Sequence, residues 1–240
     1  MPSAEVENAP VVNWSGDAYR LIPSRFPPVN VYQGLIANDR LEEVFAAENL
    51  TNPRIRSKER MASTAKDNPR LQNWNLAPFA YGNPDGTLFF KEDGPCLELS
   101  TERQTALAVS VEKRETFLES TQEAPIGLDM RMLCHPIKGR FWDLRGLSPP
   151  AAGLDEKARR EIGAMIPAEA QGILFRPLER PAGTCIAILT GEVLERSTQT
   201  THFRYMWDGK RIVLLYAFDR EGTKIEAARL ASAEEVLAAV

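Results

Sequence analysis

The sequence has little cysteine and little histidine. Three cysteines (Cys96, Cys134 and Cys185) and two histidines are spread over 240 residues. An odd, widely spaced set of cysteines in apolar contexts is typical of reduced core thiols rather than of a disulfide framework. Because His135 and His202 lie at unrelated places, we expect no histidine-based metal site.

Strong positive charge and long hydrophobic runs are also missing. Charged residues make up 26% of the chain and the net charge is only -4, so no basic surface is available to attract nucleic acid or an anionic membrane. No stretch approaches the roughly 18 apolar residues of a membrane span, and no basic-then-apolar segment opens the chain. We therefore predict a cytoplasmic protein that binds neither nucleic acid directly nor a membrane.

Enough apolar sequence is present for a core. With 43% apolar residues in 240, the chain can bury a core of its own. We expect one domain over residues 16–240, with ordered structure from about Ala18, after a flexible, polar leader at residues 1–15. Residues 54–70 are strongly polar and charged, which predicts a surface loop.

Helical spacing of apolar residues is clearest at residues 101–120. There Leu107, Val111 and Leu118 share one face, and Thr101 with Gln104 resembles a capping box. Further helices are predicted at residues 38–48, 155–166 and 232–240.

Strand signals alternate with these helices. Apolar residues alternate over 128–134, and residues 140–144 are expected to form a neighbouring strand. The short apolar runs 172–175, 184–189 and 211–218 are rich in branched or aromatic residues, which is typical of central strands. Strands dispersed among helices without strict alternation predict an α+β fold, a single domain around one mixed sheet.

A series of short blocks occurs in an order and spacing that resemble RES-domain proteins over roughly residues 18–212. The blocks are Ala18–Leu21, Leu50–Arg54, Phe79–Gly86, Leu128–Arg131, Asp143–Arg145, Gly172–Phe175, Pro181–Leu189 and Arg204–Gly209. The resemblance implies a fold similar to that of ADP-ribosyltransferases. It also implies cleavage of NAD or transfer of its ADP-ribose, by a bacterial toxin that is paired with a helix-turn-helix antitoxin.

The resemblance also implies which residues would contact NAD. An arginine can clamp the pyrophosphate and an aromatic ring can stack on the nicotinamide. The family's first arginine matches Arg20, which follows Tyr19. Its second arginine falls at Leu88, next to the aromatic Phe89, and a tyrosine falls at residues 97–98, where no ring is present. Tyr19, Arg20 and Phe89 are thus the candidate contacts to a NAD-like ligand.

Two further family positions have lost their chemistry. The glutamate that would stabilise the oxocarbenium-like ribose falls at Val109, and the serine that would orient substrate falls at Pro177. One preorganised electrostatic contact of this kind is worth about 2.7 to 4 kcal/mol of the barrier. Our leading hypothesis is therefore a RES-like protein that no longer cleaves NAD and acts by binding a protein partner, such as an antitoxin, or a nucleotide.

The alternative hypothesis is a divergent enzyme that uses Arg20 with a relocated carboxylate. Glu112 is the catalytic candidate, with Glu98 and Glu115 as substitutes, although Glu112 also fits an exposed stripe with Lys113 and Glu119. For Arg20, the competing interpretations are a structural ion pair with a core carboxylate such as Asp129 or Asp143, or a position on the surface. The sequence establishes no cofactor; NAD is the expected substrate or ligand.

Overall fold

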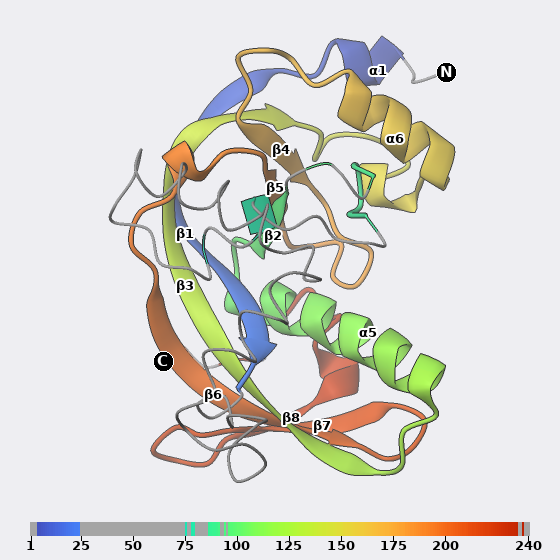
Figure 1. Ribbon diagram of the computed structural model, residues 1–240, viewed down its shortest axis with the longest axis vertical. Coiled ribbons are helices and arrows are strands. Elements are labelled where there is room, and N and C mark those ends of the chain that lie inside the picture. Colours follow the sequence, from blue (N-terminus) through green and yellow to red (C-terminus); the bar gives the residue numbers. More distant parts are fainter. Residues whose placement is uncertain are drawn as a thin grey trace, which may run out of the picture.

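One mixed sheet organises the molecule. The computed structural model describes residues 4–24, 75, 78–79, 86–91, 94, 96–234 and 237. Within these ranges eight strands lie in the order β1-β2-β5-β4-β3-β6-β7-β8 (Figure 1). The strands are β1 (Val11–Pro23), β2 (Leu97–Ser100), β3 (Ile126–Asp143), β4 (Gly172–Phe175), β5 (Cys185–Ile188), β6 (Thr198–Trp207), β7 (Ile212–Ala217) and β8 (Lys224–Glu226). The helices are α1 (Ala4–Glu7), α5 (Arg103–Thr121) and α6 (Glu156–Ala164), with short 3-10 turns at Ala151–Gly153, Gly191–Val193 and Ala227–Arg229. The predicted α+β fold with a single mixed sheet is confirmed.

Two long antiparallel strands form the spine of the sheet. β1 pairs with β3 from Val11 opposite Trp142 to Pro23 opposite Met130. Because β1 also pairs with β2, and β3 pairs with β4 at its end, the strands β1-β2-β5-β4-β3 close on themselves. The other end of β3 continues into an open antiparallel region with β6, β7 and β8.

Helices α5 and α6 cover different parts of this sheet. α5 lies across the open region, where its buried apolar face packs on β3, β6 and β7 (Figure 1). α6 lies at the closed end, where Ile162 belongs to a core with Trp142 and Phe175. A third cluster, which includes Leu97, Leu99 and Phe141, packs beside them. The helix α5 therefore faces β2 across the junction between the closed and the open halves.

Most of the predicted elements are present. The helices at 101–120 and 155–166 are confirmed as α5 and α6, and Asp155 caps α6 by accepting a hydrogen bond from the Ala158 amide at 2.8 Å. The apolar runs 172–175, 184–189 and 211–218 are confirmed as β4, β5 and β7. The predicted segments 38–48 and 54–70, and most of 232–240, lie outside the described residues.

Three local predictions were wrong. Residues 128–134 and 140–144 are not neighbours but parts of one strand, β3, because β1 pairs with it along its whole centre. The residue before α5 is Glu102 rather than Thr101, and Gln104 instead donates to carbonyls near the C-terminus. Strand β1 begins at Val11, before the expected start of order, because its partner β3 is long enough to pair with it. The division of the chain into a leader and one domain stays a prediction.

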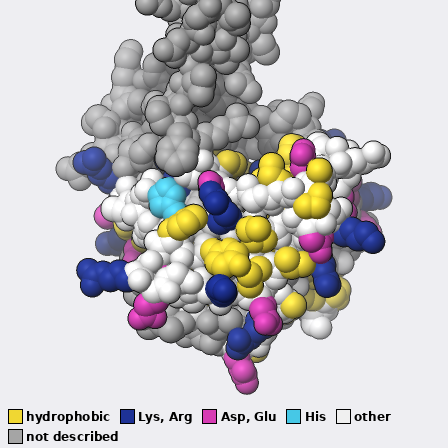
Figure 2. All heavy atoms as spheres, turned by 90° about the horizontal axis from the view of Figure 1, so that it is seen from below, with side chains coloured by type: hydrophobic (Ala, Val, Ile, Leu, Met, Phe, Trp, Pro, Cys, Tyr) yellow, Lys and Arg dark blue, Asp and Glu magenta, His cyan; other side chains and the backbone are white. Residues whose placement is uncertain are grey.

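The open end of the sheet presents a mixed surface. Seen from below, hydrophobic side chains gather there among charged ones (Figure 2). Phe218, just after β7, is 56% exposed, and the Arg204 guanidinium lies 5.7 Å from the centre of its ring. Arg204 also forms an ion pair with Asp129 at 2.7 Å. In the described part of this region the sheet thus has one face in the core and one outside it, as is common for antiparallel sheets.

Candidate functional site

A cavity of about 370 Å³ lies where β1, β2 and α5 meet. Its wall is completed by the turn at residues 86–91 and by residues 177–179, which follow β4. The sequence-predicted positions Tyr19, Arg20, Leu88, Val109 and Pro177 all line this one cavity, as do Leu97 and Glu98. Positions that are up to 158 residues apart (19 to 177) therefore form a single site.

Arg20 is a half-buried cation of this cavity. Burial lowers the pKa of its guanidinium to about 10, so it stays charged at neutral pH. The two carboxylates considered as its partners are engaged elsewhere: Asp129 binds Arg204, and Asp143 binds Arg145 at 2.6 Å. Neither Asp129 nor Asp143 is therefore the partner of Arg20. Its neighbour Tyr19 also lines the cavity, with the Arg103 guanidinium 5.7 Å from its ring centre.

An ion pair between Glu98 and Lys113 lies in the same cavity. The Lys113 ammonium is 2.7 Å from Glu98 Oε2, and the Leu88 amide donates to Glu98 Oε1 at 3.0 Å. Burial pushes the pKa of Glu98 up, but the charge and hydrogen bond of Lys113 outweigh burial and hold the pKa below its ordinary value. For Lys113, burial lowers the pKa, but the charge and the hydrogen bond of Glu98 raise it by more, so the pKa lies above its ordinary value. Both groups are thus ionised at neutral pH.

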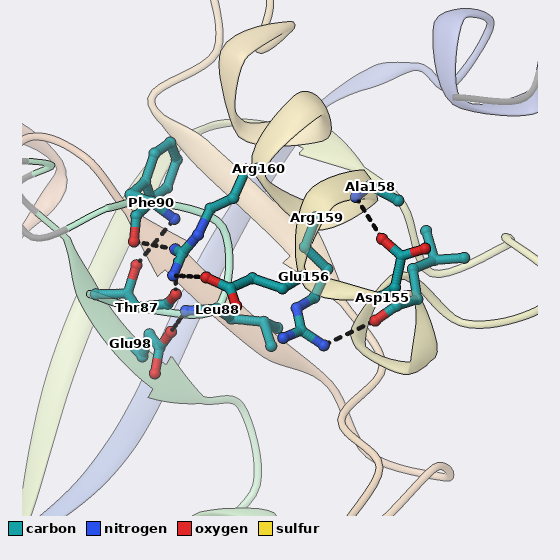
Figure 3. Close-up of polar contacts among 10 residues, drawn as sticks. Thr87, Leu88, Phe90, Glu98, Asp155, Glu156, Ala158, Arg159 and Arg160 are labelled. Carbon is teal, nitrogen blue, oxygen red and sulfur yellow. Dashed lines mark hydrogen bonds and ion pairs between the residues drawn. The ribbon is translucent and has the colours of Figure 1, made fainter. Parts of the chain in front are cut away.

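The turn at residues 86–91 is held from both sides. Figure 3 shows Glu98 reaching the Leu88 amide from β2 and Arg160 reaching the same turn from α6. Arg160 donates to the Thr87 carbonyl at 2.6 Å and to the Phe90 carbonyl, and it also pairs with Glu156. This wall of the cavity is therefore fixed to two elements of the fold.

The hydroxyl groups in the cavity wall have structural partners. Ser110 accepts a hydrogen bond from buried Tyr205 at 3.1 Å, and Ser100 lies 3.3 Å from the Cys185 sulfur. Thr87 accepts from the Phe90 amide at 3.3 Å. None of the three stands at the position of the family's serine, which Pro177 occupies, and proline offers neither a hydroxyl nor a backbone donor.

Two candidates lie away from the cavity. Phe89 is 1% exposed and packs edge-on against Phe175, with ring centres 5.2 Å apart, so it belongs to the core and we no longer expect it to stack on a ligand. Glu112 is exposed on α5. Val109 and Lys113 line the cavity and lie four residues apart on one face of that helix. Glu112 is not among the residues that line the cavity.

The cysteines are confirmed as free and buried. Cys96 and Cys185 line the cavity, but burial raises the pKa of both thiols, that of Cys185 to about 12. The thiolate is the nucleophilic form, so these sulfurs are inert at neutral pH.

Among the described residues no three histidine, cysteine or acidic side chains gather closely enough to hold a metal ion. Across the same part of the chain, no helix has both the length and the apolar character needed to cross a membrane.

Comparison with known proteins identifies the scaffold. The RES domain family matches residues 68–208, which is more than half of the chain. This chain belongs to the RES family. Over 222 residues it is 52% identical to the uncharacterized protein y4oC of Sinorhizobium fredii (strain NBRC 101917 / NGR234), covering 92% of this chain and 95% of that protein.

A solved structural neighbour is much more distant in sequence. The crystal structure of the M. tuberculosis MbcT-MbcA toxin-antitoxin complex contains a chain that matches 82% of this one, with 90% of its own length covered. The sequence identity is 14% and the TM-score is 0.41, an overlap too low to transfer anything from that complex.

Lys113 is a cavity residue that sequence reasoning did not identify. Its charged neighbours on α5 suggested an exposed stripe; its side chain is 53% exposed, and the fold also brings it to Glu98. The sequence of this RES domain held one signal for the ion pair. Glu98 stands between Leu97 and Leu99, and a carboxylate within such an apolar run needs a positively charged or hydrogen-bonding partner when it is buried. Arg114 and Glu179 also line the cavity and were not predicted.

Proposed function

We propose that this RES-domain protein has lost ordinary NAD cleavage and acts by binding. The observation that carries the proposal is that Val109 and Pro177 line the same cavity as Arg20. Arg20 thus stays at the cavity, while the positions of the family's acid and hydroxyl are held by an aliphatic side chain and an imino ring. Losing one preorganised contact slows such a reaction by about 10²- to 10³-fold, and here several are replaced together.

A second candidate function rests on Glu98. It is a carboxylate that lines the cavity, so it could replace the missing acid in a divergent enzyme that cleaves NAD or transfers ADP-ribose with Arg20. Its two oxygens, however, already accept hydrogen bonds from Leu88 and Lys113. A carboxylate neutralised in this way stabilises a developing positive charge less well than a free one.

Release of nicotinamide from NAD separates the two functions. We expect no release above the blank at high concentrations of wild-type protein. Release that disappears in Arg20→Ala and in Glu98→Gln, but persists in the exposed control Glu112→Gln, would establish the enzyme instead. The Glu98→Gln side chain keeps an acceptor for the Leu88 amide, so the turn at residues 86–91 should stay in place. If this variant releases no nicotinamide, the cause is therefore the lost carboxylate and not a disordered turn.

A protein partner is part of the proposal. The family resemblance suggests an antitoxin, and the buried, reduced thiols agree with a cytoplasmic setting. Co-expression with a helix-turn-helix protein encoded beside this chain, followed by size-exclusion chromatography, tests the partner. Co-elution at a fixed ratio is the expected result, and separate elution at micromolar concentrations would contradict it.

A further inference from the structure

The charges that line the cavity indicate which ligands it accepts, provided that the proposed binding function holds. Among the described lining residues, Arg20, Lys113 and Arg114 are cationic, and Glu98 and Glu179 are acidic. Lys113 and Arg114 both lie on α5, and their positive charges attract an anionic group.

Among the described residues, most of the remaining lining is apolar. The hydroxyls of Ser100 and Ser110 in this lining are already hydrogen-bonded. The apolar lining includes Leu21, Leu88, Val109, Phe175, Pro177 and Leu178. A sugar hydroxyl placed against this wall would lose its hydrogen bonds to water without replacement, which costs about 1 to 3 kcal/mol for each group. The wall favours a hydrocarbon or an aromatic body.

The size of the cavity sets a further limit. Its volume of about 370 Å³ is near the lower end of the range of roughly 300–1,000 Å³ for small-molecule sites. Leu178, which is 56% exposed, places an apolar side chain at the boundary with solvent. A short apolar molecule fits this space better than a dinucleotide does.

Lys113 is the natural anchor for an anionic group. Its side chain is 53% exposed, whereas that of Glu98 is 20% exposed, so the ammonium is the more accessible end of the pair. An ammonium has three N–H donors, and Glu98 accepts from one of them at 2.7 Å. The Leu88 amide holds the other Glu98 oxygen in place. An incoming carboxylate can therefore bind Lys113 without displacing Glu98.

We propose that this cavity binds a small organic monocarboxylate with an apolar body. The carboxylate lies at Lys113, and the apolar body lies against Val109, Pro177 and Leu178. The two positions where the family's acid and hydroxyl are replaced thus become the apolar part of a different ligand site.

Calorimetric titration with octanoate tests this assignment, with octanamide as the neutral control of equal length. We expect octanoate to bind and octanamide to bind at least about tenfold more weakly, since the charge-assisted hydrogen bond is lost. Glu98→Gln removes the acid that competes for Lys113 and should strengthen octanoate binding. Glu98→Gln combined with Lys113→Met leaves no charge unpaired and should abolish it. Lys157→Met, on α6 and 87% exposed, is the matched control and should bind as the wild type does.

Octanoate binding should strengthen in Glu98→Gln and disappear when Lys113→Met is added. A lysine with only a structural role would not produce these opposite changes. Equal binding of octanoate and octanamide, or weaker octanoate binding in Glu98→Gln, would overturn the inference. So would NAD or inorganic phosphate binding where octanoate does not bind; if NAD then stays intact, the proposed loss of cleavage still stands. Nicotinamide release by the wild type would instead overturn the proposed function itself.

Discussion

Arg180 holds the C-terminal segment against the helix that forms the cavity. Its side chain is 7% exposed and donates to the Ser232 carbonyl at 3.0 Å, to the Ala233 carbonyl at 3.3 Å and to the Thr105 hydroxyl at 3.0 Å. Thr105 in turn donates to Glu102 at 2.8 Å. One buried guanidinium thus joins α5, the loop before β5 and residues 232–233. Replacing it by methionine, which has a similar length, removes all three hydrogen bonds.

The expected cost follows from these contacts. Hydrogen bonds to charged groups each contribute about 1.5 to 3 kcal/mol, but they are not additive, and an apolar replacement recovers the desolvation cost of the charge. We therefore expect Arg180→Met to lower the free energy of unfolding by about 2 to 3 kcal/mol. For a chain of this size, each kcal/mol corresponds to about 2–4 °C, so the melting temperature should fall by roughly 4–12 °C.

Thermal unfolding and hydrogen exchange together test this reasoning. Exchange should accelerate first at residues 230–234, because the Ser232 and Ala233 carbonyls lose their guanidinium donor while the β3 core is untouched. Arg220→Met is the matched control: Arg220 is exposed, and its replacement should shift the melting temperature by less than about 1 °C. An unchanged melting temperature in Arg180→Met, or faster exchange spread evenly over the chain, would refute the account.

Two further predictions concern buried positions. Burial, and then the charge of Arg20, lower the pKa of His135 to about 3. The unfolded chain binds this proton near pH 6.5, so stability should fall as the pH drops from about 6.5 towards 3, by up to about 1.4 kcal/mol per pH unit. His135→Leu should remove this contribution in urea unfolding between about pH 7 and pH 4; a slope equal to that of the wild type would contradict it. A Cβ on Gly183 would overlap the Thr105 hydroxyl, so Gly183→Ala should cost about 1–3 kcal/mol, whereas Gly146→Ala, with nothing within 4 Å, should be neutral in the same assay.

The elements that could be predicted are those whose signal is local. Helix α5 carries its apolar residues at helical spacing, and β4 and β5 are short runs of buried apolar residues. The start of β1 could not be found in this way. Its residues alternate between partly buried and exposed, and its pairing partner in β3 lies more than 100 residues away in the chain, from Val11 to Trp142. A strand of this kind is stabilised by its neighbour rather than by its own composition.

The candidate site was predictable only as a set of positions. The order of short blocks placed Arg20, Val109 and Pro177 at the positions of family side chains, and the structure brings all three to one cavity. The same reasoning made Phe89 a candidate ligand contact, whereas its ring is buried against Phe175. Helical spacing placed Lys113 in an exposed stripe; its side chain is 53% exposed, but its ion pair with Glu98 could not be predicted, because it depends on which strand packs beside the helix.

The sequence by itself determined the α+β class, the reduced state expected of its cysteines, and the identity of the residues that replace the family's acid and hydroxyl. These features depend on composition, on short-range spacing, or on the residue type at one position. The tertiary structure alone decided that β1 pairs with β3, that Glu98 meets Lys113, and that a cavity forms where β1, β2 and α5 meet. Contacts between distant segments depend on the geometry of the whole sheet, and no short window of sequence encodes that geometry.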